Sequence, residues 1–197
     1  MKKIKKYLKK HLTKERYQHT LGVAYTATAM AMKYNPDPTN SDFIKKAELA
    51  GLLHDCAKNM DNGKKIRLCN KYGIPYSDFE AKNTYLLHGK VGAFIAKSKF
   101  DIQDEDILNA ITWHTTGRPG MSTLEKIIFI ADYIEPSRKP VPDLDIIRKL
   151  AFEDLDQTMK AILENTINYL QKNNKPFDSM TQKTYDSYKD ETSSLLA

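Results

Sequence analysis

The run LAGLLHDCAK at residues 49–58 decides the expected fold, because it places a histidine and an aspartate side by side at the end of an apolar stretch. Ala47, Ala50 and Leu53 recur at the spacing of one helix face. A carboxylate in such surroundings is costly unless it is coordinated or paired. Imidazole and carboxylate groups are ligands of first-row metal ions. The run therefore predicts a helix that presents His54 and Asp55 to a metal.

Three more histidines and a second aspartate stand in similar surroundings. His19, His88 and His114 each lie in a segment with helical spacing, and Asp132 ends a stretch of isoleucine, phenylalanine and alanine. Together with the adjacent pair they make six donor groups, enough for two metal ions. A single histidine on a helix is more often an ordinary core or surface residue, which is our interpretation of His11. A salt bridge would explain Asp132 alone, but not the histidines.

Helical patterns cover most of the chain. Thr13 is a good helix N-cap, and Ser122 and Glu125 have the spacing of a capping box. We find no β-hairpin pattern, no internal repeat and no second domain. The sequence therefore predicts an all-α protein, a single helical bundle in residues 1–173 followed by a loose polar tail in residues 174–197. Helices are expected at roughly 14–33, 42–58, 63–72, 85–99, 104–115, 122–132 and 150–170.

Length and composition fit a globular protein, since 41% of the 197 residues are hydrophobic and 28% are charged. No apolar stretch is long enough to span a bilayer, and no signal-peptide core follows the basic N-terminus. We therefore expect a cytoplasmic protein without a membrane partner. Two cysteines are too few for a disulfide framework. Cys56 follows the His-Asp pair, but we expect it to be a buried, inert thiol and not a ligand.

The net charge of +6 comes largely from lysines in the first 16 residues. There Ile4, Leu8 and Leu12 recur at helical spacing, which indicates a short amphipathic helix with a solvated basic face. Binding to nucleic acid or to a membrane surface is the alternative. It is disfavoured because few aromatic residues are interleaved and no nucleic-acid-binding motif is present.

Five stretches form an ordered set: RYQHTLGV (16–23), LLHDCAK (52–58), LHGKVGA (87–93), AITWHTTG (110–117), and MSTLEKI continuing to IADYIEPSR (121–138). This set resembles the H…HD…D signature of the HD-domain superfamily of metal-dependent phosphohydrolases, and more closely the YqeK-type family of symmetrical bis(5′-nucleosyl)-tetraphosphatases. The resemblance extends from about residue 10 to residue 172. An isolated His-Asp pair is weak evidence, whereas five blocks in order are highly specific.

The resemblance implies an HD-domain helical fold and a hydrolase that cleaves diadenosine tetraphosphate symmetrically into two ADP by a hydroxide bound to a dinuclear metal centre. It implies iron as the metal, with manganese or another first-row metal left open. The partner is then a dinucleoside polyphosphate, and homodimerisation is left open. The implied ligands are Asp55 as the bridge between both ions, His19, His54 and Asp132 at one ion, and His88 and His114 at the other.

The resemblance also implies which residues act on the substrate. Asp55 and Lys58 would be catalytic, and Arg118 is a weaker candidate than Arg138 for holding phosphate. The chain departs from the family pattern after Arg138, where Lys-Pro-Val-Pro-Asp (139–143) replaces the usual Pro-Gly turn, which puts the reach of Arg138 in question. The expected substrate contacts are Lys58, His88, Thr115, Thr116, Gly117 and Arg138.

Two other functions remain open at this point. One is an HD phosphohydrolase that acts on a nucleoside monophosphate, a deoxynucleoside triphosphate or an alarmone. The other is a non-catalytic, metal-stabilised module whose basic first helix docks on RNA or protein. The complete set of six donor groups argues against the second alternative, because a module without catalysis has no chemical need for all of them.

Overall fold

The computed structural model describes residues 1–190, and these contain eleven α-helices, one 3-10 helix and no strand. The prediction of an all-α fold is confirmed. The helices are α1 (Lys2–His11), α2 (Lys14–Tyr34), α3 (Asp42–Leu53), α4 (Asn62–Tyr72), α5 (Asp78–Lys82), η1 (Thr84–Leu87), α6 (His88–Phe100), α7 (Glu105–Trp113), α8 (Thr123–Ile134), α9 (Leu144–Leu150), α10 (Leu155–Lys172) and α11 (Ser179–Asp190).

The helix starts follow the caps that the sequence predicts. The Thr13 side chain accepts a hydrogen bond from the backbone of Arg16 at the start of α2. At the start of α8, Ser122 and Glu125 form the expected capping box. These side chains satisfy backbone N–H groups that a helix start leaves without partners.

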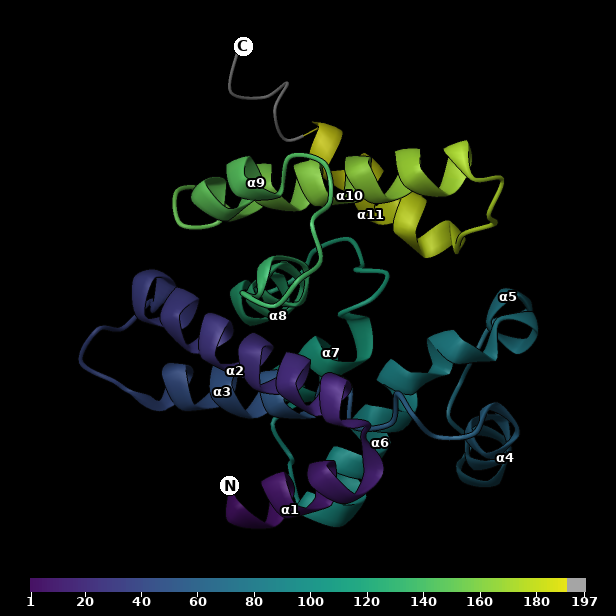
Figure 1. Cartoon of the computed structure of the whole chain (residues 1–197). Helices are drawn as coiled ribbons and strands as arrows, with labels where there is room; N and C mark the ends of the chain where they lie inside the picture. Colours follow the sequence, from purple (N-terminus) through teal and green to yellow (C-terminus); the bar gives the residue numbers. More distant parts are fainter. Residues whose placement is uncertain (191–197) are drawn as a thin grey trace.

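Helix α8 lies at the centre of the bundle (Figure 1). It contacts α2, α3 and α7 on one side and α9 and α10 on the other. Ile127, Ile128, Phe129 and Ile130 are all buried, which a helix achieves only when neighbours cover more than one of its faces. The apolar stretch before Asp132 thus places that carboxylate near the middle of the protein.

Helices α2 and α3 pack at very close range. A Cβ atom added to Gly51 of α3 would lie 2.8 Å from the Cα atom of Ala24 in α2, so a larger residue would push the two backbones apart. This close approach brings the end of α3, with His54 and Asp55, beside His19 of α2.

The structure also differs from the expected helix bounds. Helix α3 ends at Leu53, and residues 54–58 form a series of turns instead of continuing the helix. Short helices α5 and η1 occupy much of the segment before His88, and α9 forms just after the proline-rich loop. α5 begins with a capping box at Ser77 and Glu80, whereas η1 packs against α4 and α6 and α9 packs against α8 and α10, contacts that local spacing does not reveal.

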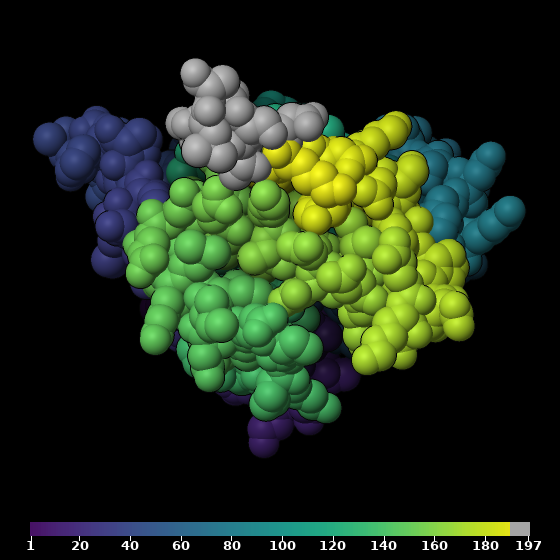
Figure 2. Space-filling model, turned by 90° about the horizontal axis from the view of Figure 1, so that it is seen from above, coloured from purple at the N-terminus to yellow at the C-terminus, as the bar shows by residue number. Residues whose placement is uncertain are grey.

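The prediction of a loose tail after residue 173 is wrong for residues 179–190, which form α11 against α10. Figure 2 shows α11 in yellow beside the green segments of α9 and α10. Its side chains Thr181, Thr184 and Tyr188 are buried. The rest of the predicted tail, residues 191–197, lies outside the described part of the chain. No helix within residues 1–190 combines the length and the apolar character needed to cross a membrane.

Candidate metal centre

The predicted ligands come from separate helices and meet around Asp55. Its Oδ1 atom lies 3.2 Å from Nε2 of His88 and 3.6 Å from Nε2 of His114. Its Oδ2 atom lies 3.5 Å from Nε2 of His54 and 3.9 Å from Nε2 of His19. The two oxygens of one carboxylate thus face two different pairs of imidazoles.

Asp132 completes one side of this cluster. Its Oδ1 atom lies 2.8 Å from Nε2 of His19 and 3.7 Å from Nε2 of His54. The structure therefore brings all six predicted donor groups together. Three sets of three have their donor atoms within 4.8 Å of one another: His19, His54 and Asp55; His54, His114 and Asp132; and Asp55, His88 and His114.

Three of the histidines are oriented by their own helices. His54, His88 and His114 are the C-cap residues of α3, η1 and α7, and the Nδ1 atom of each lies 2.7 Å from the carbonyl oxygen three residues earlier. A carbonyl can only accept, so Nδ1 carries the proton and donates it. The Nε2 lone pair of each ring is then left to face the cluster, which is the tautomer that a metal ligand needs.

Several atoms at the centre are buried without a hydrogen bond. They include Nε2 of His19, Nε2 of His54 and Oδ1 of Asp55. The short approach of His19 to Asp132 does not have hydrogen-bond geometry. Buried polar atoms are nearly always satisfied, and a cation would satisfy acceptors that are gathered in this way. The donor set and its orientation thus fit metal ions.

The electrostatics of the cluster also fit a cation. Burial by itself would raise the pKa of Asp55, but the imidazoles of His54, His114 and His88 hold it well below its usual range. Burial lowers the pKa of His88 to about 4, and the Lys58 ammonium acts in the same direction. At neutral pH, Asp55 is therefore ionised and His88 is neutral, which is the protonation that metal binding requires.

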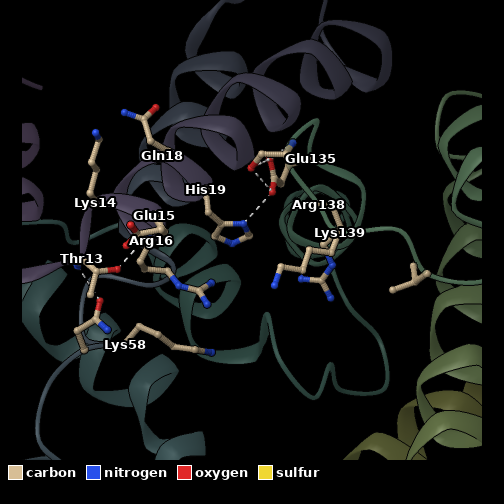
Figure 3. A pocket seen from close by; sticks show the side chains of 13 residues that line it. Thr13, Lys14, Glu15, Arg16, Gln18, His19, Lys58, Glu135, Arg138 and Lys139 are labelled. Atoms are coloured by element: carbon tan, nitrogen blue, oxygen red, sulfur yellow. Dashed lines mark hydrogen bonds and ion pairs between the residues drawn. The ribbon is translucent and has the colours of Figure 1, made fainter.

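A cavity of about 800 Å³ opens beside the cluster and reaches it at His19 and Lys58 (Figure 3). In this view Arg16 and Lys58 extend into the space below His19 from one side, and Arg138 and Lys139 from the other. The cations that line the cavity are Lys14, Arg16, Lys58, Arg138 and Lys139. Such a wall suits a ligand that carries several negative charges.

Three of the predicted substrate residues lie where a ligand would reach them. Lys58 has its Nζ 3.1 Å from Nε2 of His88 and 3.7 Å from Oδ1 of Asp55, although the turn after α3 and not a continued helix places it there. The Oγ1 atom of Thr115 lies 3.3 Å from Nε2 of His88. Arg138 lines the cavity, so the altered sequence that follows it does not turn it away.

The loop after His114, which was expected to cradle phosphate, makes several contacts within the protein. The Thr116 hydroxyl donates to the carbonyl of Gly117, and the N–H of Gly117 donates to the carbonyl of Trp113. Arg118 makes a two-pronged pair with buried Glu125, at 2.7 and 2.8 Å. The side chain of Thr115 lies against the cluster, and Thr116 and Gly117 remain predicted substrate contacts.

Two residues that the sequence did not single out belong to the site. Nη1 of Arg16 donates to Oδ2 of Asp55 at 2.9 Å, and the signal for it was its position three residues before His19 on the same helix. Nδ1 of His19 donates to Oε1 of Glu135 at 3.0 Å. Glu135 follows His19 by 116 residues, so no local pattern could have joined them.

Comparisons with known proteins agree with this geometry. The family model described as HD domain matches residues 16–137. Proteins named symmetrical bis(5′-nucleosyl)-tetraphosphatase from Halalkalibacterium halodurans and Bacillus subtilis are 43% and 41% identical over 178 residues, which is 90% of this chain and 91% of each relative. A crystal structure from Clostridium acetobutylicum, described as that of a predicted HD superfamily hydrolase involved in NAD metabolism, has 43% identity and a TM-score of 0.89, covering 96% of this chain and 97% of that one.

Proposed function

Because this chain belongs to the HD domain family, and within it to the symmetrical bis(5′-nucleosyl)-tetraphosphatases, we propose that it hydrolyses diadenosine tetraphosphate into two molecules of ADP. The observation that carries the proposal is Asp55, whose two oxygens face separate groups of imidazoles next to a cation-lined cavity. A shared carboxylate suits a pair of ions, and the cavity suits a polyphosphate.

We propose that two metal ions bind here. Asp55 would contact both, His19, His54 and Asp132 would complete one site, and His88 and His114 would complete the other. Two such ions lower the pKa of a bound water and neutralise phosphate oxygens, which supplies a nucleophile at neutral pH. Imidazole and carboxylate donors suit iron, manganese and neighbouring metals. Iron is our proposal for the native metal, following the family resemblance.

The chain's own residues would hold and polarise the substrate. The Lys58 ammonium lies next to both Asp55 and His88, so it would bind an oxygen of the reacting phosphate and stabilise the charge that develops there. The Thr115 hydroxyl lies beside the same imidazole and would donate to the same phosphate. Symmetrical cleavage breaks the central bridging P–O bond: water adds to one of the inner phosphorus atoms, and the other half leaves as ADP.

The remaining phosphates would extend along the cavity. Arg138 and Lys139 lie on the wall opposite Lys58 (Figure 3). A guanidinium binds phosphate with two parallel hydrogen bonds, so Arg138 is well suited to fix the half that leaves. Arg16 already bonds Asp55 and would also be within the cavity that the phosphates occupy.

The test is product identification combined with metal analysis. The protein, purified anaerobically, is analysed for its metal content and then incubated with diadenosine tetraphosphate. We expect about two bound first-row metal ions per chain and ADP as the nucleotide product. Formation of AMP and ATP would show asymmetrical cleavage and would contradict the proposal.

Further assays on the same protein distinguish this function from the two alternatives, a different nucleotide substrate and a non-catalytic binding module. A panel of nucleoside monophosphates, deoxynucleoside triphosphates and alarmones tests for a different substrate of the same site. A metal-loaded protein that is inert on every nucleotide but binds RNA in a salt-sensitive manner would favour the binding module. In the structure the apolar residues Ile4 and Leu8 of α1 are buried against the bundle, which leaves its lysines as a solvated face.

We propose a cytoplasmic location for this activity. Both cysteines, Cys56 and Cys69, are buried free thiols. Burial raises the pKa of Cys56 to about 12, which makes it a poor nucleophile and agrees with the inert role expected for it. Free thiols without disulfides are usual in a reducing compartment.

A further inference from the structure

His19 differs from the other histidines of the cluster in how its ring can be oriented. His54, His88 and His114 are C-cap residues, and carbonyls near a helix end are free to accept a hydrogen bond from a side chain. His19 lies inside α2, where the carbonyls of the preceding turn accept backbone hydrogen bonds. Its Nδ1 atom therefore needs an acceptor from another part of the chain.

Glu135 is that acceptor. It is the C-cap residue of α8, its carboxylate is 3.0 Å from Nδ1 of His19, and the residue is only 1% exposed (Figure 3). The carboxylate is held from its other side by Ser137, whose N–H and hydroxyl both donate to it at 2.7–2.9 Å. A buried glutamate with this many fixed contacts has one orientation, and it fixes the orientation of the ring that it contacts.

Gly22 makes this contact possible. It lies three residues after His19 on the same face of α2. A Cβ atom at this position would lie 2.5 Å from Oε2 of Glu135, too close for both to stay in place. Even an alanine at position 22 would therefore displace the carboxylate from His19 and Ser137.

The same glutamate is connected to the wall of the cavity. The N–H of Arg138 donates to the backbone carbonyl of Glu135 at 3.0 Å, and Ser137 lies between them. The turn that Glu135 begins thus carries Arg138 into the cavity. Glu135 therefore contacts both His19, a proposed metal ligand, and Arg138, a proposed phosphate ligand.

We propose that Glu135 is a positioning residue for the metal centre. It holds His19 as the Nδ1–H tautomer with Nε2 toward Asp132 and Asp55, and Gly22 provides the space for it. This inference rests on the proposed function, since it assumes that His19 binds a metal. A carboxylate behind a ligating histidine fixes its tautomer and strengthens it as a ligand, and loss of such a partner typically weakens metal binding by roughly 10–100-fold.

The test compares metal affinity among matched variants. Glu135→Ala removes the acceptor, Gly22→Ala displaces it, and Glu135→Gln keeps an amide oxygen that can accept from His19. The control Glu125→Gln changes a glutamate that is equally buried, but whose partners are Arg118 and Ser122. Gly63→Ala controls for the added methyl group, since it lies in the first turn of α4.

Metal-free protein is titrated with Mn²⁺, and the Zn²⁺-loaded protein is examined by NMR for the proton on Nδ1 of His19. We expect Glu135→Ala and Gly22→Ala to bind Mn²⁺ roughly 10–100-fold more weakly and to lose the defined tautomer of His19. Glu135→Gln should recover most of the affinity, and both controls should bind as wild type does, even if Glu125→Gln melts at a lower temperature.

Wild-type affinity in Glu135→Ala, with His19 still protonated at Nδ1, overturns the positioning role of Glu135. Wild-type affinity in Gly22→Ala overturns the role given to Gly22. A wild-type protein that takes up no Mn²⁺ overturns the proposed function as well. Equal loss of affinity in Glu125→Gln would also overturn the positioning role, because it would trace the effect to general destabilisation.

Discussion

Arg118 and Arg138 should respond to alanine substitution in opposite ways, although both were candidates for binding phosphate. Arg118 donates two hydrogen bonds to Glu125, whose side chain is 1% exposed. Arg118→Ala leaves that carboxylate with the backbone N–H of Ser122 as its partner and without its cation. We therefore expect a loss of stability with little change in catalysis.

The size of this loss follows from the contacts. Hydrogen bonds to a buried charge contribute about 1.5–3 kcal/mol. One third of the Arg118 side chain is exposed, which places the value toward the lower end of that range, at about 2 kcal/mol. For a chain of this size each kcal/mol lowers the melting temperature by roughly 2–4 °C, so Arg118→Ala should melt roughly 4–8 °C below wild type.

Arg138 lines the cavity and stacks on Tyr133, with its guanidinium carbon 5.4 Å from the ring centre. It makes no ion pair with another residue within the described part of the chain. Arg138→Ala should therefore leave the melting temperature within about 1 °C of wild type, as expected for a surface substitution. Loss of one two-pronged phosphate contact should lower kcat/KM by roughly 10–100-fold.

Calorimetric melting and steady-state hydrolysis of diadenosine tetraphosphate at 25 °C measure both quantities on the two variants, and each variant is the control for the other. The reasoning would be refuted if Arg118→Ala lost more than tenfold in kcat/KM at an unchanged melting temperature. That result would mean that Arg118 leaves Glu125 to bind substrate.

Three further substitutions and the removal of metal test the site and the packing. Asp55→Asn should abolish both metal binding and turnover, since the shared carboxylate is lost; elemental analysis and assay check this, and a fully active, metal-free variant would contradict it. Lys58→Ala should lower kcat/KM at unchanged metal content, whereas metal loss would mean that Lys58 supports the ligands instead of the substrate. Gly51→Ala should cost about 1–3 kcal/mol because its methyl group meets the backbone of Ala24, and an unchanged melting temperature would show that α2 and α3 can separate at little cost. Removal of metal by a chelator should lower the melting temperature by roughly 5–10 °C for each ion that is present at 100 times its Kd, and an unchanged melting temperature would mean that no metal stabilises the folded protein.

Much of the fold could be predicted because the signals for its main helices lie within short stretches of sequence. Thr13 caps α2 and the Ser122 capping box starts α8, and both signals depend on residues within one turn. The identity of the donor groups could also be predicted, since His54 and Asp55 directly follow an apolar helix. The six groups meet only through tertiary packing, and the sequence indicated this only through the order of its motifs.

Helix α11 shows why other parts could not be predicted. Its buried positions Thr181, Thr184 and Tyr188 recur at helical spacing, but the two threonines are not classed as apolar. The Thr184 hydroxyl donates to the carbonyl of Met180 within the helix, which satisfies the polar atom and leaves the methyl group to pack. A prediction based on hydrophobicity counts these threonine positions as polar and therefore assigns the segment to a tail.

Buried glutamates show most clearly that residue type does not fix a role. Glu80, Glu125 and Glu135 are all buried, and each accepts a hydrogen bond from the backbone N–H of a serine. The three glutamates differ in the side chain that pairs with the carboxylate. Glu80 is paired with Lys90 and Glu125 with Arg118, permanent cations that neutralise a helix cap.

Glu135 faces His19 instead, and an imidazole that donates from Nδ1 while Nε2 binds a metal carries no proton charge of its own. Its negative charge adds to those of Asp55 and Asp132, while Arg16 and Lys58 bring permanent positive charge to Asp55. Three carboxylates against two cations leave the cluster with an excess of negative charge that bound metal ions would balance. Glu135 thus pairs with a proposed metal ligand, whereas Glu125 pairs with a permanent cation, so substitution of the two glutamates should have different consequences.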